Sequence, residues 1–171
     1  RIIAIQTLFD FFLTYGLSSF DLPPSVPPEC EAYAALDFVG NSDMREMILS
    51  VLLDQLLDDS TLKIQTTTVE GFCKLIFSAT LVDEEVIARL VVMFFELESR
   101  EDDTFAITMQ QILSVFFSCF GETRSDLKEQ AKRAFLPCLK EVVQENDAKK
   151  VGPIFKLLLG LASGKRKDKE K

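Results

Sequence analysis

The sequence predicts an all-α fold, a solenoid of stacked antiparallel helix pairs. Apolar residues recur at the i, i+3, i+4, i+7 spacing of a helix, and the same apolar face recurs in three separate segments. Strand signals are nearly absent, because the β-branched residues fall at helical spacing and no hairpin turn pairs occur. A stack is expected because no single helix pair could bury such a face alone.

Three segments carry the recurring face. In the stretch "TMQQILSVFFSCF" it consists of Ile112, Val115, Phe116, Cys119 and Phe120. In "TTTVEGFCKLIFS" it consists of Val69, Phe72, Cys73, Ile76 and Phe77, and near the start of the chain of Leu8, Phe11, Phe12 and Tyr15. We expect all three faces to be buried, with Phe116 in the core and Cys119 filling space as a small apolar residue.

The spacing of these faces indicates the type of repeat. Aligning the faces equates Leu8, Val69 and Ile112, which are 61 and 43 residues apart. The second spacing lies in the ~40–47 residue period of HEAT or armadillo helix pairs. The first is longer because "GLSSFDLPPSVPPECEAYAALDFVG", with four of the six prolines, reads as an insertion. We therefore predict a HEAT-repeat segment over 1–163, with a Pro-rich insertion at about 17–41 and a basic tail at 164–171.

Apolar periodicity and capping residues place the individual helices. The predicted spans are 1–16, 43–58, 61–79, 83–98, 103–120, 124–146 and 151–163. The predicted N-caps are Asn41 or Ser42, Ser60, Asp83, and Thr123 or Ser125. Pro137 lies inside the 124–146 span, so this span is either one kinked helix or two short helices that meet there.

The composition and the apolar pattern argue against a membrane span and against a secretory signal. Of 171 residues, 47% are apolar and 27% charged, the range of an ordinary soluble protein with one core. No apolar run approaches the ~20 residues of a membrane span, and no secretory signal opens the chain. The opening "RIIAIQTLFDFF" lacks Met and is already in helical rhythm, so we expect a segment of a longer protein.

The residue types also limit the chemistry of any site. Histidine is absent, so no Cys-His or Ser-His nucleophile pair can form within the chain. The four cysteines are far apart, which favours buried free thiols over disulfides or zinc ligands: Cys30, Cys73, Cys119 and Cys138. The acidic clusters "LLDDS" and "SREDDT" lie at helix junctions, where capping and solubility explain them. We predict no catalytic residues, no metal and no cofactor.

The charge is divided unevenly along the chain. Residues 1–122 hold 6 Lys or Arg against 20 Asp or Glu, whereas residues 123–171 hold 13 against 7. The acidic part is a poor surface for nucleic acid. The end "GKRKDKEK" is most simply a solvated, disordered tail. A weaker alternative is non-specific, salt-sensitive phosphate contact by Lys149, Lys150, Lys165, Arg166 and Lys167.

Several sequence blocks resemble those of one family. "EGFCKL" at 70–75, "RLVVMFF" at 89–95, the acidic link at 98–103 and "QILSVFF" at 111–117 resemble the C-terminal HEAT region of the G-type non-SMC subunit of condensin, the chromosome-associated protein G family. "RAFLPCLKEVV" and "KKVGPIFKLLLGL" are similar to its following helices. The sequence "FFELES" departs from the Asn-Pro-containing link that relatives often have, and the insertion at 17–41 aligns with nothing in the family.

The resemblance implies a role. Members of that family are curved HEAT solenoids that bind the kleisin subunit and help to clamp DNA, beside two SMC ATPases that carry the catalysis. It implies a non-catalytic scaffold in mitotic chromosome condensation, with no membrane and no small-molecule substrate. The implied location is the nucleus and chromosomes, with the cytoplasm in interphase as an alternative. Two alternatives remain, a HEAT adaptor of a transport or signalling complex and an α-helical enzyme that uses carboxylates.

Overall fold

The computed structural model describes residues 1–17, 41–57, 61–100, 103–123, 125–144 and 148–163, without the side chains of 41–44, 99, 121–123 and 148. Within these residues the secondary structure is helical, and no strand occurs. The elements are α1 (Ile2–Tyr15), α3 (Asn41–Leu57), α4 (Leu62–Phe77), α5 (Glu84–Glu96), the 3₁₀ turn η2 (Leu97–Ser99), α6 (Thr104–Thr123), α7 (Ser125–Arg133), α8 (Phe135–Gln144) and α9 (Ala148–Ser163). The predicted all-α solenoid is confirmed.

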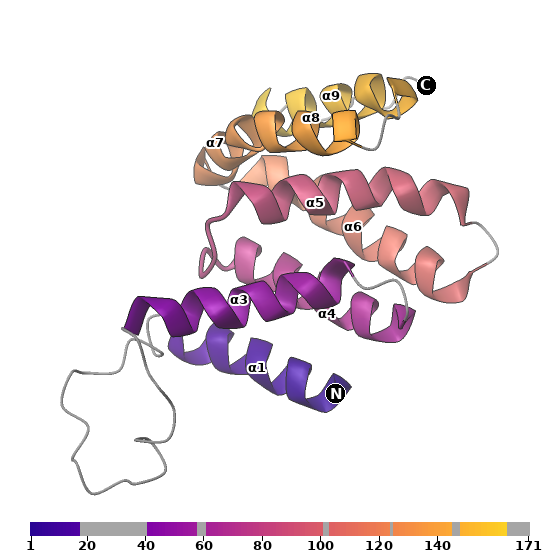
Figure 1. The fold of residues 1–171 in the computed structure, drawn as a ribbon. Helices are drawn as coiled ribbons and strands as arrows, with labels where there is room; N and C mark the ends of the chain where they lie inside the picture. The colour runs from indigo at the N-terminus through magenta and orange to yellow at the C-terminus, as the bar shows by residue number, and fades with distance from the viewer. Residues whose placement is uncertain (18–40, 58–60, 101–102, 124, 145–147, 164–171) are drawn as a thin grey trace, which may run out of the picture.

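The helices stack in two layers (Figure 1). In one layer α1 packs on α4, α4 on α6, and α6 on α9. The other layer contains α3, α5 and α8: α3 packs across α4 of the first layer, and α5 packs against α8. Figure 1 shows α1 and α9 at opposite ends of the stack, and α5 and α6 doubling back on each other through the turn at η2. Each pair of helices therefore covers its neighbours in the stack, as the repeat period predicts.

The core places the buried face of α6 elsewhere than predicted. Phe116 and Phe120 are buried as expected, but Val115 is 64% exposed and Cys119 is also exposed. The prediction that these two residues lie in the core was wrong. The buried residues of α6 instead follow a stripe rotated by about one residue: Ala106, Met109, Leu113, Phe116, Phe117 and Phe120.

The predicted face of α1 is rotated in the same way, whereas that of α4 is largely right. Phe11 and Tyr15 on α1 are exposed, and the buried residues there are Ile5, Phe9 and Phe12. On α4 only Phe77 leaves the predicted face; Val69, Phe72, Cys73 and Ile76 are buried. Because α4 is packed against α1, α3 and α6, it buries a wide arc that tolerates an error in register.

Aromatic packing over a glycine brings α1 and α4 together. The ring of Phe9 lies edge-on to that of Phe72, with centroids 5.4 Å apart. A Cβ atom built on Gly71 would overlap the Phe9 ring. The close helix approach that a glycine in mid-helix indicates is therefore present between α4 and α1.

Acidic side chains cap two of the helices. Asp83 Oδ1 accepts hydrogen bonds from the backbone N–H groups of Glu85 (2.9 Å) and Val86 (3.1 Å), which confirms the predicted cap of α5. In the "SREDDT" cluster, Asp103 accepts from Phe105 N (2.9 Å) at the start of α6, so capping accounts for this carboxylate.

The other predicted caps have different outcomes. At α4 the N-cap position is Thr61, which makes no side-chain capping bond. Ser125 is the first residue of α7, while Thr123 ends α6. Ser60 and the side chains of Asn41 and Ser42 lie outside the described residues.

The predicted 124–146 span forms two short helices, which is the second of the two alternatives. The break falls at Ala134, between α7 and α8, and Pro137 is the third residue of α8. Proline fits the first turn of a helix, where its missing N–H is not needed. Further along, α9 begins at Ala148, three residues earlier than predicted, and includes Pro153. The insertion at 17–41, apart from its ends, and the tail at 164–171 lie outside the described residues.

Candidate interaction surface

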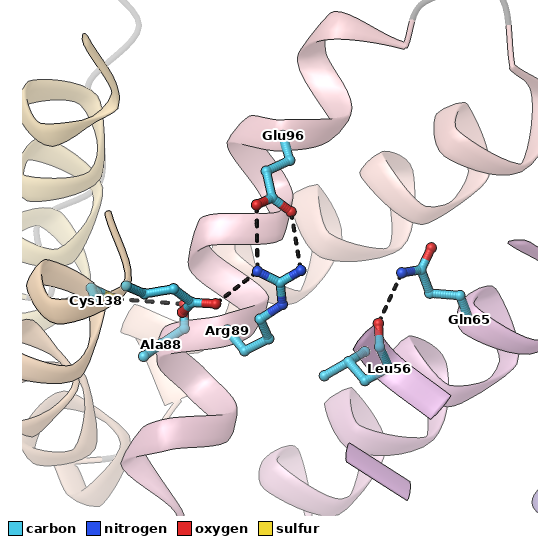
Figure 2. Close-up of polar contacts among 7 residues, drawn as sticks. Leu56, Gln65, Ala88, Arg89, Glu96 and Cys138 are labelled. Carbon is cyan, nitrogen blue, oxygen red and sulfur yellow. Dashed lines mark hydrogen bonds and ion pairs between the residues drawn. The ribbon is translucent and has the colours of Figure 1, made fainter. Parts of the chain in front are cut away.

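A half-buried ion cluster joins α5 to α8. Arg89 Nη1 lies 2.7 Å from Glu141 Oε1, and Arg89 Nη2 lies 3.3 Å from Glu96 Oε2. The side chains retain 17% and 25% of their exposure, so the pairs are only partly screened by solvent. Figure 2 shows the guanidinium of Arg89 facing the carboxylate of Glu96. Since Glu141 is 52 residues from Arg89, no local sequence pattern could have predicted this cluster.

Two buried polar contacts also link neighbouring helices (Figure 2). Cys138 Sγ on α8 lies 3.6 Å from the carbonyl oxygen of Ala88 on α5. On the other side of the stack, Gln65 Nε2 donates to the carbonyl oxygen of Leu56, 2.8 Å away. Leu56 belongs to the last turn of α3, where carbonyl groups lack helical partners, so Gln65 satisfies one of them. These groups are structural and face the protein interior.

The outward face of α6 is a candidate surface for binding a partner. From Thr104 to Gly121 the helix has no charged residue, although its face opposite the core is open to solvent. Its most exposed apolar residue is Val115 at 64%, with Phe105 and Ile107 at 41% each. The polar groups between them are uncharged: Thr108, Gln111, Ser114 and Ser118. Hydroxyls along this face bond back to their own helix, as Thr108 does to Thr104 O (2.8 Å) and Ser118 to Ser114 O (2.7 Å).

This outward face is unusual for a solvent-exposed helix. Exposed helix faces usually carry charges, and uncharged faces with apolar residues are typical of contact surfaces. The signal was present in the sequence as the long uncharged run "TFAITMQQILSVFFSCFG". It was interpreted as burial, because the predicted apolar face is rotated by about one residue from the buried one, which puts Val115 and Cys119 on the solvent side.

The predicted phosphate-contact residues are described only in part. Lys149 is exposed and Lys150 half-buried in the first turn of α9, where the helix dipole adds positive potential. Lys165, Arg166 and Lys167 lie outside the described residues.

Two of the three described cysteines pack in the core, and the third, Cys119, is exposed. Cys73 and Cys138 are buried and unbonded to other cysteines, as predicted, and Cys30 lies outside the described residues. Burial, with Glu141 as a second cause, raises the pKa of the Cys138 thiol to about 12. Burial likewise raises the pKa of Cys73, with Glu70 adding to the shift. These two thiols are unreactive near neutral pH.

In the described ranges, no group of three or more Cys, Asp or Glu side chains is placed to hold a metal ion.

No single described helix is long and apolar enough to cross a membrane. One bent pair, Thr104–Phe120 with Ser125–Gln144, passes by length and composition together, but its halves meet at 118°. In the first half, Met109, Leu113 and Phe120 are fully buried in the core.

Comparison with known proteins identifies the family. The family model described as "Nuclear condensing complex subunits, C-term domain" matches residues 1–169. This chain belongs to that family. Condensin complex subunit 3 of Homo sapiens is 27% identical over 147 residues, which cover 81% of this chain and 14% of the human protein. Condensin complex subunit 3 of Xenopus laevis is 26% identical over 157 residues, which cover 80% of this chain and 15% of the relative.

The family match covers more of the chain than the sequence blocks on which the resemblance rests. It includes α1 and the residues of the 17–41 insertion as well as the C-terminal helices. The chain spans about a seventh of the length of the curated relatives it matches. The activity and the partners of those whole proteins are therefore only proposals for this chain.

Proposed function

We propose that this chain is a non-catalytic scaffold segment of a condensin subunit, acting in chromosome condensation in the nucleus and on chromosomes. The observation that carries the proposal is the family match over residues 1–169. The fold supports it, because a stack of helix pairs offers long surfaces for other chains.

The proposed partners are the kleisin subunit and, through it, the SMC ATPase pair. Co-purification with the full-length protein from dividing cells tests this. Kleisin and SMC subunits at comparable amounts support the proposal. A different set of partners, without either, would favour the alternative of a HEAT adaptor in another complex.

Within this role, we assign the kleisin contact to the outward face of α6. The support is its exposed, uncharged surface with Ile107 and Val115. A charged side chain there would have to lose its hydration against an apolar partner segment, which is unfavourable. Val115→Glu in the full-length protein should therefore reduce kleisin recovery at least ~10-fold, equivalent to about 1.4 kcal/mol of binding free energy.

A matched control separates binding from folding. Val143 on α8 is 71% exposed, so Val143→Glu adds the same charge to another helix. Both variants should melt within about 2 °C of the parent, because exposed positions contribute little to stability. Equal loss of kleisin in both variants, or in neither, would remove the α6 face from the proposal while leaving the scaffold role untouched.

DNA contact is assigned to the basic C-terminal part. Lys165, Arg166 and Lys167 would contact phosphate with Lys149 and Lys150, without reading base sequence, while the acidic N-terminal part contributes repulsion. Replacing Lys165, Arg166 and Lys167 by Ala should remove most of the duplex binding seen by fluorescence anisotropy at low salt and leave the melting temperature unchanged. Binding by this triple variant that survives physiological salt would mean that the helical stack itself holds a DNA site.

A further inference from the structure

The helix α7 is held to the molecule differently from its neighbour α8. It has nine residues and ends at the break at Ala134. It packs mainly on α9, with smaller contacts to α5, α6 and α8, whereas α8 packs mainly on α5 and also on α9. Pro137 has no N–H to donate to the Arg133 carbonyl, which is one of the helical bonds that would otherwise span the break. Ala134 itself keeps two such bonds, from its own N to Gln130 O (2.9 Å) and from Cys138 N to its own O (3.0 Å). The two halves of this helix therefore have different main neighbours and are joined by an interrupted backbone ladder.

The anchorage of α8 is well satisfied. Cys138 and Val142 are each 1% exposed, and the thiol lies against the carbonyl oxygen of Ala88. Glu141 reaches across to Arg89 at 2.7 Å. Apolar burial, a polar contact and an ion pair therefore all hold α8 on α5.

The anchorage of α7 contains an unsatisfied polar group. Its buried side chains are Leu127 and Ala131, both 0% exposed, and Gln130, 4% exposed. Neither the side-chain oxygen nor the nitrogen of Gln130 has a hydrogen-bond partner within the described part of the chain. Burying an amide without partners opposes docking by an amount comparable to what burying one leucine contributes. Leu127 is the only large apolar side chain that α7 places in the core.

The exposed side of α7 adds little to its attachment. Lys132 pairs with Glu129 at 3.1 Å, but both belong to α7 and are more than half exposed. Such a pair supports the helix itself and does not fix it to another helix.

We propose that α7 is a hinged element that undocks from α9 as a unit, pivoting at Ala134, while α8 stays on α5. The unsatisfied amide of Gln130 keeps the docked and undocked states close in free energy. The solenoid thereby gains a local opening near its C-terminal end that does not require the rest of the stack to unfold.

Hydrogen exchange followed by mass spectrometry on the full-length protein tests the proposal. Amides of α7 should exchange at least ~10-fold faster than those of α8. Gln130→Leu removes the unsatisfied amide at similar volume. It should slow the exchange of α7 amides ~10-fold without changing the exchange of α8 amides. Leu127→Ala should accelerate exchange in α7 and again leave α8 unchanged.

Gln65→Leu is the matched control. Gln65 is also a buried glutamine, at 2% exposure, but it donates to Leu56 O. Its replacement should accelerate exchange at the α3–α4 contact, the opposite sign to Gln130→Leu. The proposal is overturned if α7 is as protected as α8, if Gln130→Leu leaves α7 unchanged because bound water satisfies the amide, or if α7 and α8 respond together.

Discussion

The α1–α4 contact and the α5–α8 contact join helices by different chemistry. In the first, the Phe9 and Phe72 rings pack over Gly71, and burial and shape complementarity hold the helices. In the second, Arg89 bridges two carboxylates and Cys138 meets a backbone carbonyl. The first contact depends on volume, and the second on charges that are half-buried. One repeat architecture therefore tolerates neighbouring contacts with different responses to mutation, salt and pH.

The largest expected effect is the loss of the aromatic ring from the apolar contact. Phe9 is 3% exposed, so Phe9→Ala should lower the free energy of unfolding by about 3–5 kcal/mol, through lost burial and the cavity left behind. Urea denaturation measures this. Phe11→Ala, on the same helix but 37% exposed, is the control and should cost under ~1 kcal/mol. Equal losses would mean that Phe9 does not lie in the contact.

Overpacking the same contact should have the next largest effect. Gly71→Ala places a methyl group against the Phe9 ring and should destabilise by about 1–3 kcal/mol despite the better helix propensity of alanine. Gly160, where an added Cβ meets nothing within 4 Å, is the matched position. Gly160→Ala should stabilise by up to about 1 kcal/mol, as measured by thermal melting. A stabilising Gly71→Ala would show that the two helices are not in close contact.

Breaking the ion cluster should have a smaller effect than emptying the aromatic site. Arg89→Met keeps most of the side-chain volume but leaves Glu96 and Glu141 without the guanidinium, at an expected cost of about 1–2 kcal/mol, between exposed and fully buried pairs. Unlike the loss from Phe9→Ala, this loss should shrink in 1 M salt, where the Debye length is about 3 Å. Lys132→Met, which breaks an exposed pair, should cost under ~0.5 kcal/mol. A salt-independent loss at Arg89 would assign its contribution to packing alone.

Alkaline pH should weaken both contacts slightly, since each has a thiol close by. The pKa of Cys138 is raised to about 12 in the folded chain, against 9.0 for an unperturbed thiol, so folding favours the neutral form. Its contribution to stability is complete below pH 9 and is lost as pH rises from 9 towards 12, by about 1 kcal/mol at pH 10. Cys138→Ala should flatten the urea midpoint between pH 8 and pH 10 relative to the parent. The same slope in both proteins would contradict a buried Cys138.

The sequence was sufficient to predict the helical architecture, but it was insufficient to predict which face of each helix is buried. Helical periodicity and the 43-residue spacing identify stacked helix pairs, and Asp83 is legible as a cap because its carboxylate acts within its own turn. The orientation of α6 could not be predicted from the sequence, since Val115 and Phe116 are both apolar. Only the neighbouring helices decide which of the two is buried. The break at Ala134 depends in the same way on tertiary packing, since α7 packs mainly on α9 and α8 mainly on α5.

The candidate surface follows from the same limitation. An uncharged helix reads as core in a one-dimensional pattern, so α6 could be identified as exposed on one side only once α4 and α9 were in place. The Arg89 cluster and the unsatisfied Gln130 left no local signal, because their environment is built from residues far apart in sequence.

The placement of α1 and α9 at opposite ends of the stack has a consequence for cooperativity. Among the described residues, the main helix contacts carry a disturbance from one end to the other through α4 and α6, which are the intermediate members of that layer. Such a chain of nearest-neighbour couplings frays from its ends instead of melting as a block. Unfolding curves recorded with a probe on α1 and with a probe on α9 should then separate along the denaturant axis, so that partly frayed species are populated between them.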